Sequence, residues 1–144
     1  MSQTAERWDL SYTQNRELSW LAFDQRVLEE AADPAVPLME RFRFLSIFTS
    51  NLDEFFMIRV GSLYDMAVMG DDQVDSRTGL LPSQQLEAIY RRAVLLMEQR
   101  DQLGARMKEM QASLDLLNQK IDRYEQSMVS AERKLRLLHT EQTE

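Results

Sequence analysis

The sequence contains no cysteine and only one histidine, His139, close to its end. Without cysteine there is no disulfide framework and no thiolate to act as nucleophile or ligand. A single histidine argues against a zinc site and against a Ser-His-Asp triad. We therefore expect His139 to be an exposed histidine at a helix end rather than a catalytic group.

Glycine and proline are also scarce, with four and three among 144 residues. The glycines stand far apart, at positions 61, 70, 79 and 104, so no glycine-rich loop is available to hold a phosphate. Leucine, methionine, glutamate, glutamine and arginine are abundant, and these residues favour helices. The composition predicts an all-α protein.

An excess of positive charge and a long apolar run are both missing. The formal net charge is -7, whereas nucleic-acid-binding surfaces are basic, so no nucleic-acid partner is expected. No run approaches the roughly 20 apolar residues that span a bilayer, and the first ten residues lack the apolar centre of a signal peptide. We expect no membrane partner and a soluble, cytoplasmic protein.

The apolar spacing predicts a small bundle of three short helices, followed by a long fourth helix. A polar leader covers residues 1–14. Helices are expected over 17–32, 38–48 and about 50–69, and a fourth helix begins with Ser83 as its cap, after a loop over 70–82. Glu17 and Asp24 are expected to face solvent on the first helix, as are Arg41 and Arg43 on the flanks of the second. The expected core comprises Trp20, Phe23, Val27, Leu28, Phe42, Leu45, Phe48, Phe55, Phe56 and Leu63.

The stretch 49–59 places polar residues inside an apolar run. Ser50 or Asn51 can cap a helix, and Asp53 and Glu54 then stand at capping-box spacing. Arg59 falls on the same side as the apolar residues. Two interpretations follow: a capped core helix from which Arg59 reaches water, or a helix start that receives an anion or nucleotide through Asn51 and Arg59.

A strict seven-residue apolar repeat occupies the end of the chain and predicts a coiled coil. It runs from Leu103 to Leu138, and Lys120 and Glu125 flank it at the spacing that pairs across a parallel dimer. We expect a homodimer through this segment; an antiparallel fold-back and a partly frayed helix are the alternatives. Gly104 weakens the helix and is a candidate bend. The members of the repeat are Leu103, Met107, Met110, Leu114, Leu117, Ile121, Tyr124, Met128, Ala131, Leu135 and Leu138.

No catalytic constellation is evident from the sequence. Adjacent carboxylates such as Asp53 and Glu54 diverge on a helix, and no acidic cluster predicts a magnesium site. The residues themselves therefore favour a binding or assembly module over a complete enzyme.

Several runs closely resemble the start of bacterial polyphosphate kinases, over about residues 14–100. They are NRELSWLAF (15–23), RVLEEA (26–31), PLMER (37–41), RFLSIF (43–48), SNLDEFF (50–56), TGL (78–80) and QQLEAI (84–89). The resemblance implies a small helical N-terminal domain, here residues 15–100. In that family such a domain contributes to the base side of an ATP site, and the asparagine of the SNLDEFF run, here Asn51, contacts ATP.

The resemblance also implies which parts of the reaction lie elsewhere. These kinases move the terminal phosphate of ATP onto polyphosphate through a phosphohistidine, with magnesium. The catalytic histidine, the phosphate-binding arginines and the magnesium ligands belong to further domains, and His139 matches none of them. We therefore expect no catalytic residue and no metal ligand in this chain, magnesium only together with those catalytic domains, and the domains themselves as a partner.

Residues 101–144 are expected to form a coiled-coil extension. The stretch 107–125 weakly resembles the dimerisation helix of MerR-like transcription regulators, whose DNA-binding helices have no counterpart here. Two functions remain open: an ATP-contacting domain of a polyphosphate kinase that is inactive alone, or a non-catalytic oligomerisation or adaptor module that acts through the coiled coil.

Overall fold

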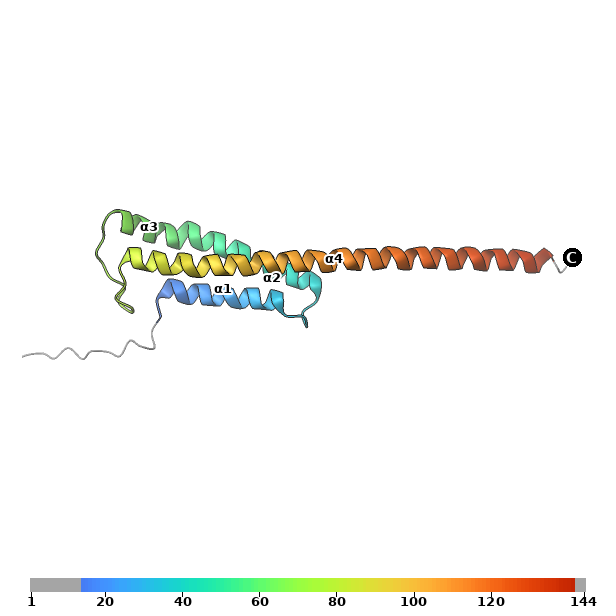
Figure 1. Cartoon of the computed structure of the whole chain (residues 1–144), viewed down its shortest axis with the longest axis horizontal. Helices are drawn as coiled ribbons and strands as arrows, with labels where there is room; N and C mark the ends of the chain where they lie inside the picture. Colours follow the sequence, from blue (N-terminus) through green and yellow to red (C-terminus); the bar gives the residue numbers. More distant parts are fainter. Residues whose placement is uncertain (1–13, 142–144) are drawn as a thin grey trace, which may run out of the picture. The chain divides into compact units, whose positions relative to one another are not determined.

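The computed structural model describes residues 14–141, with side chains as far as His139. It contains α1 (Arg16–Ala32), α2 (Leu38–Phe55), a π-helical segment η1 (Phe56–Val60), α3 (Gly61–Val68) and α4 (Pro82–Glu141) (Figure 1). No strand occurs among these residues. The predicted all-α architecture, with a long last helix, is confirmed. The expected leader falls almost wholly outside the described residues.

The chain divides into two units, Met1–Gly104 and Ala105–Glu144. The first is a bundle built from α1, from the continuous run of α2, η1 and α3, and from the first part of α4. The second consists of the remainder of α4. The candidate site lies in the first unit.

Contacts between named side chains set the direction of each helix in the bundle. Asn15, at the start of α1, hydrogen-bonds Gln85 of α4, and Gln25, in the middle of α1, hydrogen-bonds Arg92 further along α4, so these two helices run in the same direction. In Figure 1 the blue α1 accordingly lies alongside the yellow first part of α4. Phe56 stacks on Tyr90, while the more N-terminal Leu45 approaches Gly104. The helix from 38 to 68 therefore runs opposite to α4.

The expected helix start at Ser50 or Asn51 is wrong. Both residues lie inside α2, which continues to Phe55 and then passes through η1 into α3 with helical backbone angles throughout. Phe48, Leu52 and Phe55 are buried at steps of four and three, so one apolar stripe crosses this stretch without a break. The polar residues between them lie inside the helix and cap nothing.

Burial on α1 is displaced by one residue from the expected stripe. Leu21 and Asp24 are fully buried and Glu17 is nearly so, whereas Phe23 is 56% exposed. The expectations for Glu17, Asp24 and Phe23 are therefore wrong. Because α1 contacts both α2 and α4, its buried face is wider than a single apolar stripe and includes polar groups that form hydrogen bonds.

The rest of the expected core divides into two groups. Leu28, Phe48, Phe55 and Leu63 are buried as predicted. Trp20, Val27, Phe42, Leu45 and Phe56 are half-buried.

The start of α4 differs from the expected cap at Ser83. Pro82 is the first helical residue, and the Leu81 carbonyl accepts from the Gln85 N–H at 2.9 Å. The Leu81 N–H in turn donates to Gln84 Oε1 at 2.9 Å. This is one half of a capping box: the Gln84 side chain returns to the N–H of the cap residue, while the leucine at the cap has no side-chain oxygen to complete the pair.

Gly104 does not interrupt α4. A Cβ at this position would lie 3.4 Å from Leu45 Cδ2, so the glycine marks a close approach of α4 to α2. It is therefore a packing feature of the bundle and not a break in the helix.

In the second unit the apolar repeat is exposed from Met110 onward, whereas Met107 is buried. From Met110 to Leu138, the large side chains of the repeat are between 39% and 73% exposed. No helix in the described part of the chain is long and apolar enough to cross a membrane.

Candidate functional site

Asn51 lies on the side of α2 that faces α1, where its Nδ2 donates a 3.0 Å hydrogen bond to Asp24 Oδ1. Asp24 is three residues after Leu21 and four before Leu28, both buried, so the helical repeat carries its carboxylate into the core. Asn51 itself is half-buried. The pair therefore joins a buried carboxylate to an amide that reaches the surface.

The second oxygen of Asp24 is unusual. Asp24 Oδ2 is buried and has no hydrogen-bond partner among the described residues. Burial disfavours the charged form and raises the pKa of Asp24 from 3.8 to about 6, while the hydrogen bond from Asn51 opposes this shift. Asp24 is thus a carboxylate whose only described partner is Asn51.

An aromatic cluster adjoins this pair. Trp20 and Phe55 stack with ring centres 4.5 Å apart and planes at 1°, and Phe56 meets Phe55 edge-on at 5.8 Å. Tyr90 of α4 continues the cluster against Phe56 at 5.9 Å. These contacts tie α1, α2 and α4 together one helical turn from Asn51, and they fix the neighbourhood of its amide.

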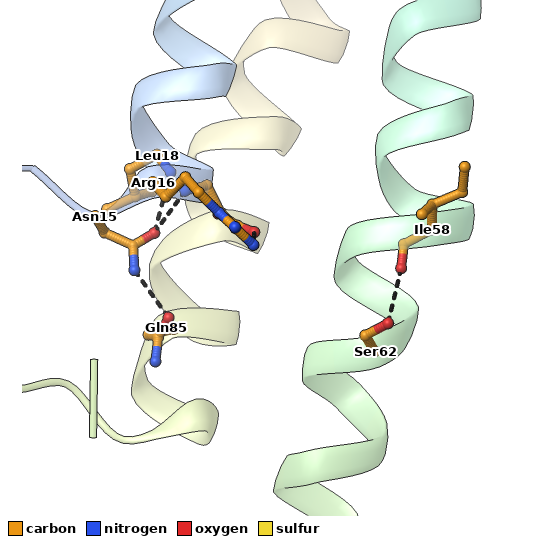
Figure 2. A network of polar contacts seen from close by, with 7 residues as sticks. Asn15, Arg16, Leu18, Ile58, Ser62 and Gln85 are labelled. Carbon is orange, nitrogen blue, oxygen red and sulfur yellow. Dashed lines mark hydrogen bonds and ion pairs between the residues drawn. The ribbon is translucent and has the colours of Figure 1, made fainter. Parts of the chain in front are cut away.

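Arg59 belongs to the π-helical segment. Its guanidinium carbon lies 6.0 Å from the centre of the Trp20 ring, within the range of a cation–π contact. The Gly61 N–H bonds the Phe56 carbonyl, five residues back, which is the π-helical pattern. Ser62 Oγ also donates to the Ile58 carbonyl at 3.1 Å, as Figure 2 shows. Single π-helical turns within α-helices are frequent at functional sites.

The structure brings the two predicted site residues to the same side of one helix, although not to a helix start. Asn51 contacts Asp24 and Arg59 contacts Trp20, both on α1. They are two helical turns apart, roughly 12 Å along the axis. Free backbone N–H groups are not available at Asn51, so recognition there depends on side chains. An amide and a guanidinium can together bind a polar, anionic molecule.

A second polar cluster lies at the start of α1 and was not predicted. Asn15 caps α1 by accepting from the N–H groups of Glu17 and Leu18, and its Nδ2 donates to Gln85 Oε1 at 2.8 Å (Figure 2). Arg16 donates to the buried Glu17 carboxylate at 3.0 Å. An asparagine immediately before a helix is a recognised cap signal, whereas nothing in the sequence indicates Gln85 as its partner.

This second cluster borders a cavity of about 480 Å³ between α1, α3, α4 and the loop before α4. Asn15 and Gln85 satisfy one another, and Gln85 Nε2 also donates to the Leu80 carbonyl at 3.0 Å. The cluster therefore holds the loop against the bundle and leaves no buried amide in need of a ligand.

Asp24 is the residue of the first cluster that sequence analysis missed. A carboxylate placed in step with Leu21 and Leu28 is the signal that could have identified it. Among the described residues, no group of His, Cys, Asp and Glu could hold a metal ion.

Comparison with known proteins matches residues 13–122 to the family described as polyphosphate kinase N-terminal domain. A polyphosphate kinase of Exiguobacterium sp. is 57% identical over 84 residues, which are 58% of this chain and 12% of the relative. That of Bacillus cereus is 54% identical over 89 residues, 62% of this chain and 13% of the relative. The chain thus spans about an eighth of the length of these curated relatives. No solved structure matches the chain.

Proposed function

Because the chain belongs to the polyphosphate kinase N-terminal domain family, we propose that it contributes contacts to ATP in polyphosphate synthesis. Asn51 is the residue proposed to touch the nucleotide. The transfer of phosphate, and the magnesium that it uses, are assigned to catalytic domains outside these 144 residues. We further propose that the domain acts in the cytoplasm, where ATP is plentiful.

The observation that supports this proposal is the hydrogen bonding of the Asn51 amide. Its Nδ2 is held by Asp24, and no described residue donates to its Oδ1. Because the side chain is only half-buried, this oxygen and the second Nδ2 hydrogen remain available to a base. An amide with one free acceptor and one free hydrogen can hydrogen-bond a heterocycle. This favours a binding role for Asn51 over a purely structural one.

Arg59 is proposed as a weaker, second contact. Its charge lies on the side of the helix that also carries Asn51, although its guanidinium is already engaged with Trp20. One amide and one partly engaged cation supply little affinity once the entropy of association is counted. We therefore expect the chain alone to bind ATP weakly and to turn nothing over.

An amide NMR titration of the full chain with Mg-ATP tests the proposal. Shifts should cluster around Asn51 and the facing part of α1, and N51A should abolish them. The exposed Ser50 provides the matched control, and S50A should retain the response. Circular dichroism of each variant establishes that it is folded. Unchanged shifts in folded N51A would reject Asn51 as the contact.

We also propose that the second unit pairs with a second copy of the chain. From Met110 onward the large apolar side chains of the repeat are exposed, and the heptad places them on one stripe. In a parallel pair, Lys120 of one copy faces Glu125 of the other, which favours that orientation. This surface supports the alternative function, an oligomerisation module, and it is compatible with the nucleotide contact.

A further inference from the structure

The geometry points to Asp24 as a positioning residue that orients the Asn51 amide to accept an adenine base and to reject guanine. The inference rests on the proposed ATP contact and adds its base specificity. Asp24 does not touch the nucleotide; it acts through Asn51.

The first step of the argument is the direction of the hydrogen bond. An ionised carboxylate has no proton and only accepts, so the group of Asn51 that faces Asp24 must be the NH₂. Asp24 Oδ1 receives that bond at 3.0 Å. The Asn51 Oδ1 must then point away from Asp24, because the two amide atoms lie on opposite branches of the same planar group.

The second step is the isolation of the carboxylate. Asp24 is 0% exposed, and its Oδ2 has no described partner. Arg92 of α4 donates to Gln25, the residue next to Asp24 in the sequence. Among the described residues only Asn51 hydrogen-bonds this carboxylate, so no other donor competes for its oxygens. A buried carboxylate with one donor holds that donor firmly, because losing it leaves the charge unpaired.

The third step is complementarity with the base. The oriented amide offers one acceptor, Oδ1, and one remaining Nδ2 hydrogen. Adenine presents an N6 amine beside the N7 acceptor, and asparagine is a recognised bidentate partner of this edge. Guanine presents two acceptors, O6 and N7, on the same edge. The Asn51 Oδ1 would then face a guanine acceptor, which is repulsive, so the orientation imposed by Asp24 selects adenine.

The variant D24N separates this role from a structural one. An asparagine at position 24 has the same shape but offers both a donor and an acceptor, so the Asn51 amide can turn over. Its stability at neutral pH should equal or exceed that of the wild type, because a neutral amide is less costly to bury than a carboxylate. A purely structural contact has no reason to lose base preference while stability is kept.

The experiment measures ATP and GTP binding to the full chain by NMR titration, for the wild type, D24N and the exposed control D53N. The wild type and D53N should prefer ATP by roughly 5- to 150-fold, the value of one bidentate base contact. D24N should bring the ratio of the two affinities close to 1. The side-chain NH₂ signals of Asn51 should also move between pH 5 and 7 in the wild type and stay constant in D24N.

The outcomes distinguish the inference from the function on which it rests. If D24N keeps the ATP preference of the wild type, Asp24 has no positioning role, although the ATP contact stands. If the wild type responds to neither nucleotide, the proposed function fails and the base selection fails with it. If D24N does not fold, the wild type decides: equal affinities for ATP and GTP would overturn the inference, because the oriented amide would then select no base.

Discussion

Arg41, on α2, donates from its Nε to the main-chain carbonyl of Ala31 on α1 across 2.7 Å, and both residues are buried. The sequence predicted a solvated Arg41, because arginine is seldom buried. This guanidinium satisfies a carbonyl in the last turn of α1, where the helix itself provides no partner. R41A should therefore lower the free energy of unfolding by about 1–3 kcal/mol, measured in urea.

The matched control for this prediction is Arg43, two residues further along α2. Its side chain is 75% exposed and pairs with Glu40 at 3.0 Å. R43A should change the free energy of unfolding by at most about 0.5 kcal/mol, because exposed ion pairs contribute little. Equal losses of unfolding free energy in the two variants would show that the buried Arg41–Ala31 hydrogen bond stabilises the fold no more than the exposed Arg43–Glu40 pair.

The buried carboxylate of Asp24 predicts a pH dependence of stability. Its pKa rises from 3.8 to about 6 on folding, so the folded state binds the proton more tightly than the unfolded state. The contribution of Asp24 to stability therefore falls as pH rises from about 4 to about 6. D24N lacks this loss, and its advantage over the wild type should grow across that range towards about 3 kcal/mol at most.

Urea unfolding of the wild type and D24N between pH 4 and pH 8 measures that advantage. Other carboxyl groups cancel in the difference between the two proteins. The exposed D53N again provides the control. An advantage that is constant with pH would mean that Asp24 does not titrate in this range on folding.

Gly104 offers a stabilising substitution. A glycine inside a helix costs about 1 kcal/mol relative to alanine, and a Cβ at this position would be in ordinary contact with Leu45 Cδ2 at 3.4 Å. G104A should raise the melting temperature, whereas G104L has no room beside Leu45 and should lower it. If G104A is less stable than the wild type, α2 and α4 are closer than the structure places them.

The proposed pairing of the second unit predicts the effect of charge in the repeat. L114D and I121D place a carboxylate in the seam, where burying it is costly, and should give monomers of 16.9 kDa by light scattering. Q119D adds the same charge on the outer face of the helix. This variant should remain a dimer, with twice the monomer mass. A wild type that already has the monomer mass would refute the pairing.

The helical class and much of the core could be predicted from the sequence, because apolar spacing reports which residues of one helix share a face. Phe48, Phe55 and Leu63 were identified in this way. The helix start at Asn51 was predicted wrongly because residue types that cap helices also occur inside a continuous helix, as Asn51 does where it faces Asp24 of α1. The local sequence cannot distinguish a helix cap from a polar residue inside a helix, because the distinction depends on contacts with the neighbouring helix.

The contacts of the candidate site were anticipated only in part for the same reason. Asn51 and Arg59 were predicted as site residues, the first also by the resemblance to polyphosphate kinases; both contact α1, and their role in binding stays a prediction. Asp24 was assigned to solvent because carboxylates are rarely buried. Its partner lies 27 positions away. Long-range pairing of this kind has no signature in the spacing of a single helix.

The π-helical turn sets the rotational phase of the helix segments on its two sides. Before it the buried positions are 48, 52 and 55, and after it they are 60 and 63, so a step of five interrupts steps of three and four. The turn absorbs one surplus residue and keeps both halves facing the core.

Deleting the 78%-exposed Met57 should therefore restore an unbroken α-helix with both faces in place. A deletion elsewhere in α2 would instead rotate one half by about 100° out of the core. The chain between Phe55 and Val60 is thus the one stretch of this helix in which losing a residue should preserve the packing of both halves.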